Sequence, residues 1–162
     1  MALRLGVFSP LLVTALAWSV RAREVAWLVP GLLLWTILEY LMHRFAFHGF
    51  APHYDHHAEP TQESYLLAPL WLSMSMAAAL WLLLALATGS FSRAAAVMAG
   101  VIAGYLLYEA VHLRIHRPVS GGPVLRALRR YHFYHHFADD RVCYGVTSPL
   151  WDVVLGTRRR AQ

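Results

Sequence analysis

All ten histidines of this 162-residue chain fall in three short stretches of the sequence. Imidazole is the commonest protein ligand for transition metals, so this clustering indicates a metal site. A zinc site usually takes about four ligands, and ten imidazoles therefore suggest two ions with about five ligands each. The candidate metal ligands are His43, His48, His53, His56, His57, His112, His116, His132, His135 and His136.

Most of these histidines have a spacing that places them on one face of a helix. His112 and His116 are four residues apart, and residues at that spacing are neighbours on a helix surface. The two HxxHH segments, 53–57 and 132–136, each place three imidazoles within about one and a half turns. Each segment can therefore present its rings to a common point.

His43 and His48 need a different arrangement, because they are five residues apart. Five steps of about 100° leave two side chains about 140° apart on a regular helix. The two rings can converge only if the helix loosens or ends between them, and we expect Gly49 and Pro52 to provide that ending.

Three acidic residues are candidates for orienting the metal ligands. Glu39 and Glu109 each lie about one turn before a histidine, in apolar stretches where a carboxylate is costly and normally has a partner. We expect each to accept a hydrogen bond from the second ring nitrogen of a ligand, and Asp152 is a weaker candidate for the same role. The alternative is that Glu39 and Glu109 pair with Arg44 or Arg114 at the membrane surface.

Other kinds of chemistry lack their usual sequence patterns. The chain contains no GxSxG serine-hydrolase turn, no HExxH zinc-protease helix and no dinucleotide fingerprint. Reducing equivalents for a redox reaction would therefore come from another protein. The single Cys143 excludes an internal disulfide and is expected to be a small buried residue. The sequence has no stripe of basic residues of the kind that would indicate nucleic-acid binding.

The composition indicates a membrane protein. Hydrophobic residues make up 58% of the chain and charged residues only 14%, which is too apolar for an ordinary soluble domain. Spans of roughly 20 apolar residues predict transmembrane helices, and the candidates are residues 5–20, 25–42, 64–92 and 94–113. The first could instead be a cleaved signal peptide; we expect a retained helix because no clear cleavage site follows it.

The expected fold is an all-α membrane protein in a single domain, residues 1–162. About four transmembrane helices would carry a cytoplasmic helical cap that holds the metal centre, with histidine boxes at 43–57, 112–116 and 132–136. In the cap we predict an amphipathic helix that starts near Pro123, and a short final helix with Ser148 as N-cap and Gly156 as its end. Gly100 and Gly104 predict a small-residue face for close helix packing.

The distribution of arginines predicts the orientation in the membrane. Of the 14 basic residues, all arginine, we assign all but Arg21, Arg23 and Arg93 to the face that carries the histidines. The positive-inside rule then makes the histidine face cytoplasmic, and we expect a multi-pass protein of a bacterial cytoplasmic membrane.

The histidine boxes and the C-terminal residues resemble those of a known superfamily. The boxes HxxxxH, HxxHH, HxxxH and HxxHH occur in the order typical of the integral-membrane fatty acid hydroxylase and sterol desaturase superfamily. The similarity runs from about Leu38 to Thr157 and is closest to fatty acid 2-hydroxylases. It is carried by LEYLMHRF at 38–45, by YHFYHHF at 131–137 and by GVTSPLWD at 145–152.

This resemblance implies a dinuclear centre in which all ten histidines are ligands. Iron would be the metal of the active form, since zinc lacks the redox chemistry, although a purified sample could hold zinc. The resemblance also implies oxygen-dependent hydroxylation of an aliphatic C–H bond of a lipid, with dioxygen as co-substrate and a separate electron-donor protein as partner.

The identity of the substrate stays open at this point. A fatty acyl chain is the first choice, and the short gap between His48 and His53 keeps a carotenoid or a sterol, hydroxylated or desaturated, as alternatives. An alternative of another class is a membrane metal-binding or transport protein. Transporters place their ligands near the middle of the bilayer, whereas these boxes lie at helix ends, which argues against transport.

Overall fold

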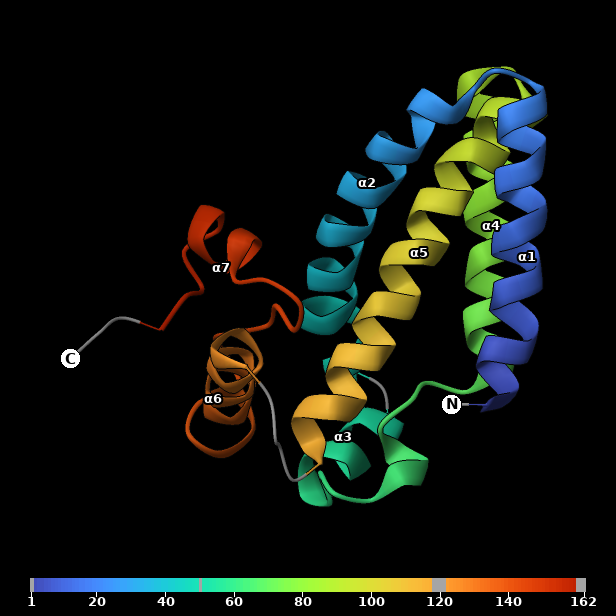
Figure 1. Cartoon of the computed structure of the whole chain (residues 1–162). Helices are drawn as coiled ribbons and strands as arrows, with labels where there is room; N and C mark the ends of the chain where they lie inside the picture. The colour runs from blue at the N-terminus through green and yellow to red at the C-terminus, as the bar shows by residue number, and fades with distance from the viewer. Residues whose placement is uncertain (1, 50, 118–121, 160–162) are drawn as a thin grey trace. The chain divides into compact units, whose positions relative to one another are not determined.

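The computed structural model describes residues 2–49, 51–117 and 122–159, and these residues form helices and loops without a β-strand (Figure 1). The all-helical architecture confirms the expected class of fold. The α-helices are α1 (Ala2–Arg21), α2 (Leu28–Leu41), α3 (Ala51–Ala58), α4 (Leu70–Thr88), α5 (Phe91–His116), α6 (Pro123–Phe137) and α7 (Leu150–Val154). The other helical turns are η1 (Val25–Trp27), η2 (Met42–Ala46), η3 (Phe47–Gly49) and η4 (Glu63–Tyr65).

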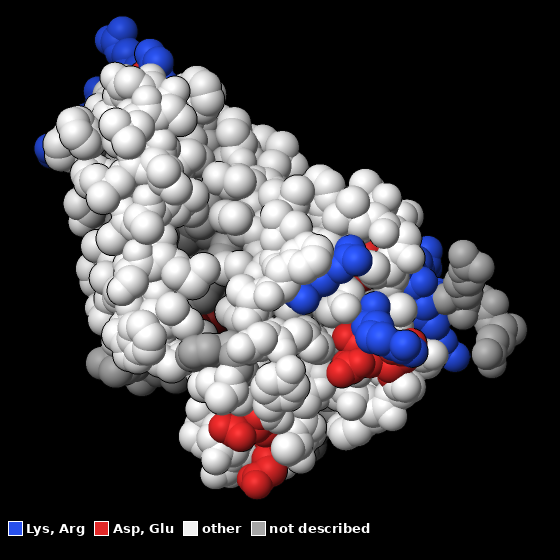
Figure 2. All heavy atoms as spheres, turned by 180° about the vertical axis from the view of Figure 1, so that it is seen from behind, with Lys and Arg blue, Asp and Glu red and all other residues white. Residues whose placement is uncertain are grey.

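Among the described residues, three helical stretches are long and apolar enough to cross a membrane: Val25–Gly49, Leu70–Thr88 and Phe91–His116. They match three of the four predicted spans. Figure 2 shows one face of the molecule, on which uncharged side chains cover most of the surface. The helix predicted for residues 5–20 is present as α1, and its place in the membrane stays a prediction.

The limits of α4 follow from its flanking residues. Pro69 occupies the N-cap position, and Gly89 ends the helix with a φ of 61°, the left-handed conformation that favours glycine. The helix is shorter than the predicted range 64–92, because the chain forms the turn η4 and a loop before Pro69.

The chain divides into two compact units, and α2 and α5 contribute residues to both. Unit 1 consists of Met1–Trp35 and Ala68–Leu106, and therefore contains α1 and α4. Unit 2 consists of Thr36–Leu67 and Leu107–Gln162, and contains α3, α6, α7 and all ten histidines.

In unit 1, glycine allows α2 and α5 to pack with their backbones in contact. A Cβ atom built on Gly100 would lie 2.3 Å from the carbonyl oxygen of Leu28, and one on Gly31 only 2.0 Å from that of Val97. A Cβ atom on Gly104 would lie 2.5 Å from the Trp35 indole. No larger residue fits at these distances, which confirms the predicted small-residue face.

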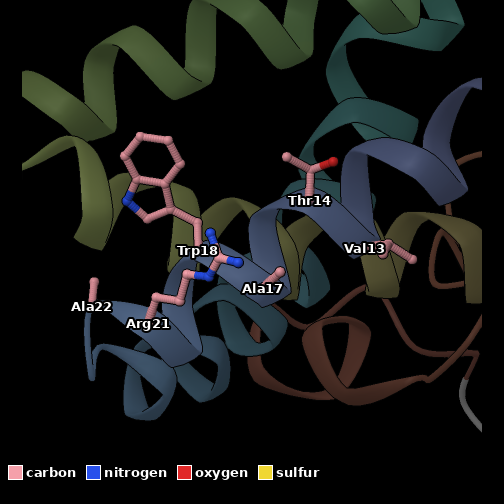
Figure 3. A pocket seen from close by; sticks show the side chains of 6 residues that line it. All are labelled: Val13, Thr14, Ala17, Trp18, Arg21 and Ala22. Carbon is pink, nitrogen blue, oxygen red and sulfur yellow. The ribbon is translucent and has the colours of Figure 1, made fainter.

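Unit 1 also has a hollow of about 620 Å³ along the C-terminal half of α1 (Figure 3). Trp18 is fixed at this hollow, because its indole Nε1 donates a hydrogen bond to Ser92 Oγ at 2.9 Å. No histidine lines the hollow. The lining residues are Val13, Thr14, Ala17, Trp18, Arg21 and Ala22.

In unit 2, α6 and α7 form where the sequence predicted a cap helix and a short final helix. α6 has Pro123 in its first turn, as expected from the fixed φ of proline. The start of α7 differs by one residue from the prediction, since Pro149 and not Ser148 is the N-cap. Gly156 follows α7 with a φ of 73°, as expected for a residue that ends a helix.

Candidate metal centre

The structure brings the ten histidines of unit 2 into two groups of five. Within a group each residue offers one ring nitrogen, and these nitrogens lie within 4.8 Å of one another. Nitrogens on opposite sides of one ion would be about 4 Å apart, so each group has roughly the size of one metal site. The first group is His43, His48, His53, His57 and His135, and the second is His56, His112, His116, His132 and His136.

A π-helical turn brings His43 and His48 into the same group. Regular α-helix ends at Leu41, and the turn η2 follows, in which Phe47 N–H donates to the carbonyl oxygen of Met42. This bond joins residues five apart, so side chains at that spacing come close to one face. The expected loosening of the helix therefore occurs inside this turn. The helical stretch then ends at Gly49, as expected, whereas Pro52 lies in the first turn of α3.

Each HxxHH segment contributes to both groups. On α3, His53 and His57 are four residues apart and belong to the first group, whereas His56 belongs to the second. On α6 the four-residue pair belongs to the second group and His135 to the first. This division follows from helix geometry, because adjacent residues point about 100° apart.

Ring nitrogens face one another at short distances within each group. In the first group, Nε2 of His48 is 3.2 Å from Nε2 of His135. In the second group, Nε2 of His116 is 2.9 Å from Nε2 of His132. If two nitrogens bind one ion, each at about 2.1 Å and with an N–metal–N angle of about 90°, the nitrogens are about 3 Å apart. The observed distances match that arrangement.

Some of the buried ring nitrogens have no hydrogen-bond partner in the part of the chain that the structure describes. His56 is only 1% exposed, and neither of its nitrogens has such a partner; the same holds for Nε2 of His43. A buried polar atom without a partner is costly, and a bound ion would satisfy it. Neutral imidazoles with no carboxylate among them suit iron, copper or zinc. The residues present therefore fit a pair of transition-metal ions.

Backbone carbonyls fix the orientation of three of these histidines. Nδ1 of His43 donates to the carbonyl oxygen of Tyr144, and Nδ1 of His135 donates to that of Val142 at 2.7 Å. In the second group, Nδ1 of His112 donates to the carbonyl of Leu66 at 3.0 Å. A carbonyl can only accept, so Nδ1 carries the proton and Nε2 keeps its lone pair. These acceptors could not be predicted from the sequence, because every residue carries a backbone carbonyl.

Glu39 acts on the loop after α6, in a way that differs from the expected one. Its Oε1 accepts hydrogen bonds from the backbone N–H of Val146 at 2.7 Å and of Thr147 at 2.8 Å, and Oε2 accepts one from the Thr147 hydroxyl. Arg44, considered as an alternative partner of Glu39, donates to the Tyr40 hydroxyl at 2.7 Å. Glu39 thus reaches the histidines through the loop that carries the carbonyl of Tyr144.

Asp152 holds the same loop from α7. It is fully buried and accepts hydrogen bonds from the backbone N–H of Tyr144 at 2.9 Å and of Gly145 at 2.8 Å, and from the Thr157 hydroxyl at 2.8 Å. Asp152 was expected to accept a hydrogen bond from a histidine. The hydrogen bonds observed instead hold the loop whose carbonyls contact the histidines. Glu109 is 1% exposed on α5, and a hydrogen bond between it and a ligand stays a prediction.

Burial keeps the histidines of α3 and α6 uncharged at neutral pH. It is the main cause that lowers the pKa of His56 to about 3, and those of His57 and His135 to about 4, from the ordinary value of 6.5. Neighbouring imidazoles lower the pKa of His56 further. A neutral imidazole has the free lone pair that a metal ion requires.

Tyr144 is a neighbour of the first group that the sequence did not single out. Its ring centroid lies 5.7 Å from that of His43 and 5.3 Å from that of His135. Burial raises the pKa of its hydroxyl, so the side chain is neutral. The preceding Cys143 is a free, buried thiol, as predicted.

Comparison with known proteins identifies relatives of this chain. The model of the fatty acid hydroxylase family matches residues 28–157. The chain is 35% identical over 138 residues to dihydroceramide fatty acyl 2-hydroxylase FAH2 of Arabidopsis thaliana, with 78% of this chain and 58% of that protein covered. It is 31% identical over 147 residues to ceramide very long chain fatty acid hydroxylase scs7 of Schizosaccharomyces pombe, with 82% and 42% covered.

A solved structure has a similar fold. It is described as full-length scs7p with only the hydroxylase domain visible, and it superposes with a TM-score of 0.88 at 28% sequence identity. The superposition covers 96% of this chain and 65% of that chain. The chain thus spans 58% of the Arabidopsis relative and 65% of this solved chain.

Proposed function

Because this chain belongs to the fatty acid hydroxylase family, we propose that it is a membrane oxidoreductase that hydroxylates an aliphatic carbon of a lipid acyl chain. The observation that carries the proposal is the gathering of ten imidazoles into two groups of five. A structural zinc site needs about four ligands, whereas two groups of five nitrogens exceed that number and suit a pair of redox-active ions.

The two groups would hold one iron ion each. All ten histidines act as ligands in this proposal, and the bound pair would supply the redox chemistry that dioxygen activation requires and that zinc lacks. A purified sample could hold zinc in its place. The carbonyls of Leu66, Val142 and Tyr144 orient three of the ligands, and the loop held by Glu39 and Asp152 keeps two of these carbonyls in position.

The reaction balances with an external source of electrons. One oxygen atom of dioxygen enters the C–H bond to give the alcohol, and the other leaves as water, which takes up two electrons and two protons. No dinucleotide fingerprint occurs in the sequence, so we propose that a separate redox protein supplies the electrons.

We propose a fatty acyl chain as the substrate and carbon 2 as the position. The support comes from the names of the relatives, which include dihydroceramide fatty acyl 2-hydroxylase and fatty acid 2-hydroxylase of Homo sapiens. The three stretches that are long and apolar enough to cross a membrane support a location in the bilayer, where such lipids are found. The excess of arginine on the histidine-bearing ends supports a cytoplasmic location for the metal centre.

Expression in a lipid-producing host tests this function. Lipids from cells with the parent chain, with His135→Ala and with Arg130→Ala are compared by mass spectrometry for hydroxylated acyl chains, carotenoids and sterols. We expect 2-hydroxylated acyl chains with the parent, a loss on the order of 100-fold with His135→Ala, and near-parent levels with Arg130→Ala, an exposed residue of the same helix. Growth under ¹⁸O₂ should place the label in the new hydroxyl group.

Two outcomes would contradict the proposal. Identical lipids from the parent and His135→Ala would remove the support for any oxygenase activity in these lipid classes. A new double bond in place of a hydroxyl group would retain the dimetal oxidant but change the reaction to desaturation.

A further inference from the structure

The short helix α7 presents an apolar face that no part of the described protein covers. Leu150, Val153 and Val154 are 48%, 52% and 59% exposed, and Leu155 directly after the helix is 45% exposed. The first three residues recur at intervals of three and four, so they form one face of the helix. Four exposed aliphatic side chains in six residues of a fixed, well-packed segment need an apolar environment.

A residue beside this apolar face attaches α7 to α2. The Trp151 indole Nε1 donates a hydrogen bond to Thr36 Oγ1 at 2.9 Å. Thr36 lies within the membrane-spanning stretch Val25–Gly49, six residues before Met42, where the π-helical turn begins. Thr36 therefore lies about 9 Å along the helix from that turn, inside the stretch that is apolar enough to cross a membrane.

The loop before α7 is buried, and the protein itself satisfies its backbone N–H groups. Four successive backbone N–H groups lie before α7 outside any helix, and each donates to a buried carboxylate, two to Asp152 and two to Glu39. Non-helical backbone at membrane depth is tolerated only where the protein itself satisfies its polar groups. A loop exposed to water would not need this arrangement.

The residues after α7 return to a polar environment. Thr157 is buried, and its hydroxyl bonds to that of Tyr40 on α2 at 2.9 Å. Arg158 and Arg159 follow and are exposed. An apolar segment that ends in arginines is typical of a helix at the boundary between acyl chains and headgroups, where long basic side chains reach the water.

We propose that α7 is inserted into the membrane beside α2, with its apolar face in contact with the acyl chains of the bilayer. Lipid is the occupant because α7 is held at the level of a spanning helix, and what surrounds a protein at that level is lipid. The inference depends on α2 crossing the membrane and is independent of the catalytic activity, so either can fail without the other.

Fluorescence from an environment-sensitive label tests this placement. The probe, an NBD group, is attached to Val154→Cys and, as the matched control, to Ala127→Cys, an exposed residue of α6 between Arg126 and Arg130. The full chain is reconstituted in vesicles of phosphatidylcholine and phosphatidylglycerol. Cys143 is fully buried, and the parent chain treated with the same reagent measures its background.

We expect the label at Val154 to be quenched by lipids that carry a doxyl group near the headgroup, and to be at least about threefold less sensitive to aqueous iodide than the label at Ala127. Leu155→Cys provides a second position if Val154→Cys fails to fold, and it should behave in the same way. The proposal would be overturned if iodide quenched the labels at positions 154 and 155 as strongly as the label at position 127, and if doxyl lipids quenched neither of them. That result would show that the face is in water or against a soluble partner.

Discussion

Asp152 determines the geometry of the first histidine group without touching a histidine. It binds the N–H groups of Tyr144 and Gly145, and so fixes the loop whose carbonyls receive the Nδ1 protons of His43 and His135. The loop cannot accept a side chain at position 145, because a Cβ atom there would be 2.0 Å from the carbonyl oxygen of Ser148. The orientation of the His43 and His135 rings thus depends on the buried carboxylate of Asp152.

The substitution Asp152→Asn should therefore weaken both the fold and metal binding. Asparagine offers one acceptor where aspartate uses two oxygens for three donors, so we expect the free energy of unfolding to fall by about 2 kcal/mol. The metal bound per chain should fall as well. Denaturant titration in micelles and elemental analysis measure the two effects.

The matched control is Asp139→Asn, which alters a surface ion pair with Arg141. It should leave stability and metal content close to those of the parent. Equal metal content in the parent and in Asp152→Asn would show that the loop does not position the ligands.

The buried imidazoles make the metal-free protein sensitive to acid. The pKa of His56 is lowered to about 3 and that of His135 to about 4 in the folded chain, against 6.5 in the unfolded chain. Below pH 6.5 these histidines bind protons in the unfolded chain but not in the folded chain. Their contribution to the free energy of unfolding is therefore fully present above pH 6.5 and is lost as the pH falls toward 4. Each such histidine contributes on the order of 1 kcal/mol per pH unit.

We expect the thermal midpoint of the metal-free protein in detergent to be lower at pH 5.5 than at pH 7.5 by at least about 5 °C. Few carboxyl groups titrate in this interval, so the change reports mainly on histidine. An unchanged or higher midpoint at pH 5.5 would mean that these rings take up protons while the chain stays folded.

At the level of secondary structure elements, α2 has two different tasks along its length. Its first half packs against α5 through glycine, and its end loosens into the π-helical turn that aligns His43 with His48. Both the contact with α5 and the π-helical turn depend on the path of the backbone over a few residues. A side chain at Gly100 would meet the backbone of Leu28, which cannot move aside without breaking the helix contact.

The substitution Gly100→Ala should accordingly lower the free energy of unfolding by about 1–3 kcal/mol, the usual cost of overpacking. Gly6→Ala in α1 is the control, since a Cβ atom there has nothing within 4 Å and alanine favours a helix. Unfolding in mixed micelles compares the two. If Gly100→Ala left the free energy of unfolding unchanged, α2 and α5 would be able to move apart at no cost.

The sequence predicted the helices and the clustering of the histidines better than the hydrogen bonds around them. Apolar stretches located α2, α4 and α5, because burial in lipid needs long runs of apolar residues. The spacing of His43 and His48 showed that the helix must change, but the kind of turn depends on tertiary contacts that sequence does not record. The hydrogen bonds that Glu39 and Asp152 accept from the loop could not be predicted, since the donors are backbone N–H groups, which nearly every residue has.

For the molecule as a whole, the interleaving of the HxxHH histidines links the filling of the two sites. α3 and α6 each carry ligands of both groups, so an ion bound in one group immobilises segments that the other group also needs. If these groups hold ions, the entropic cost of ordering the helices should fall mainly on the first ion, and we expect the second to bind with higher affinity. Native mass spectrometry during an anaerobic Fe(II) titration should show empty and doubly loaded chains, with singly loaded chains scarcer than independent sites would give.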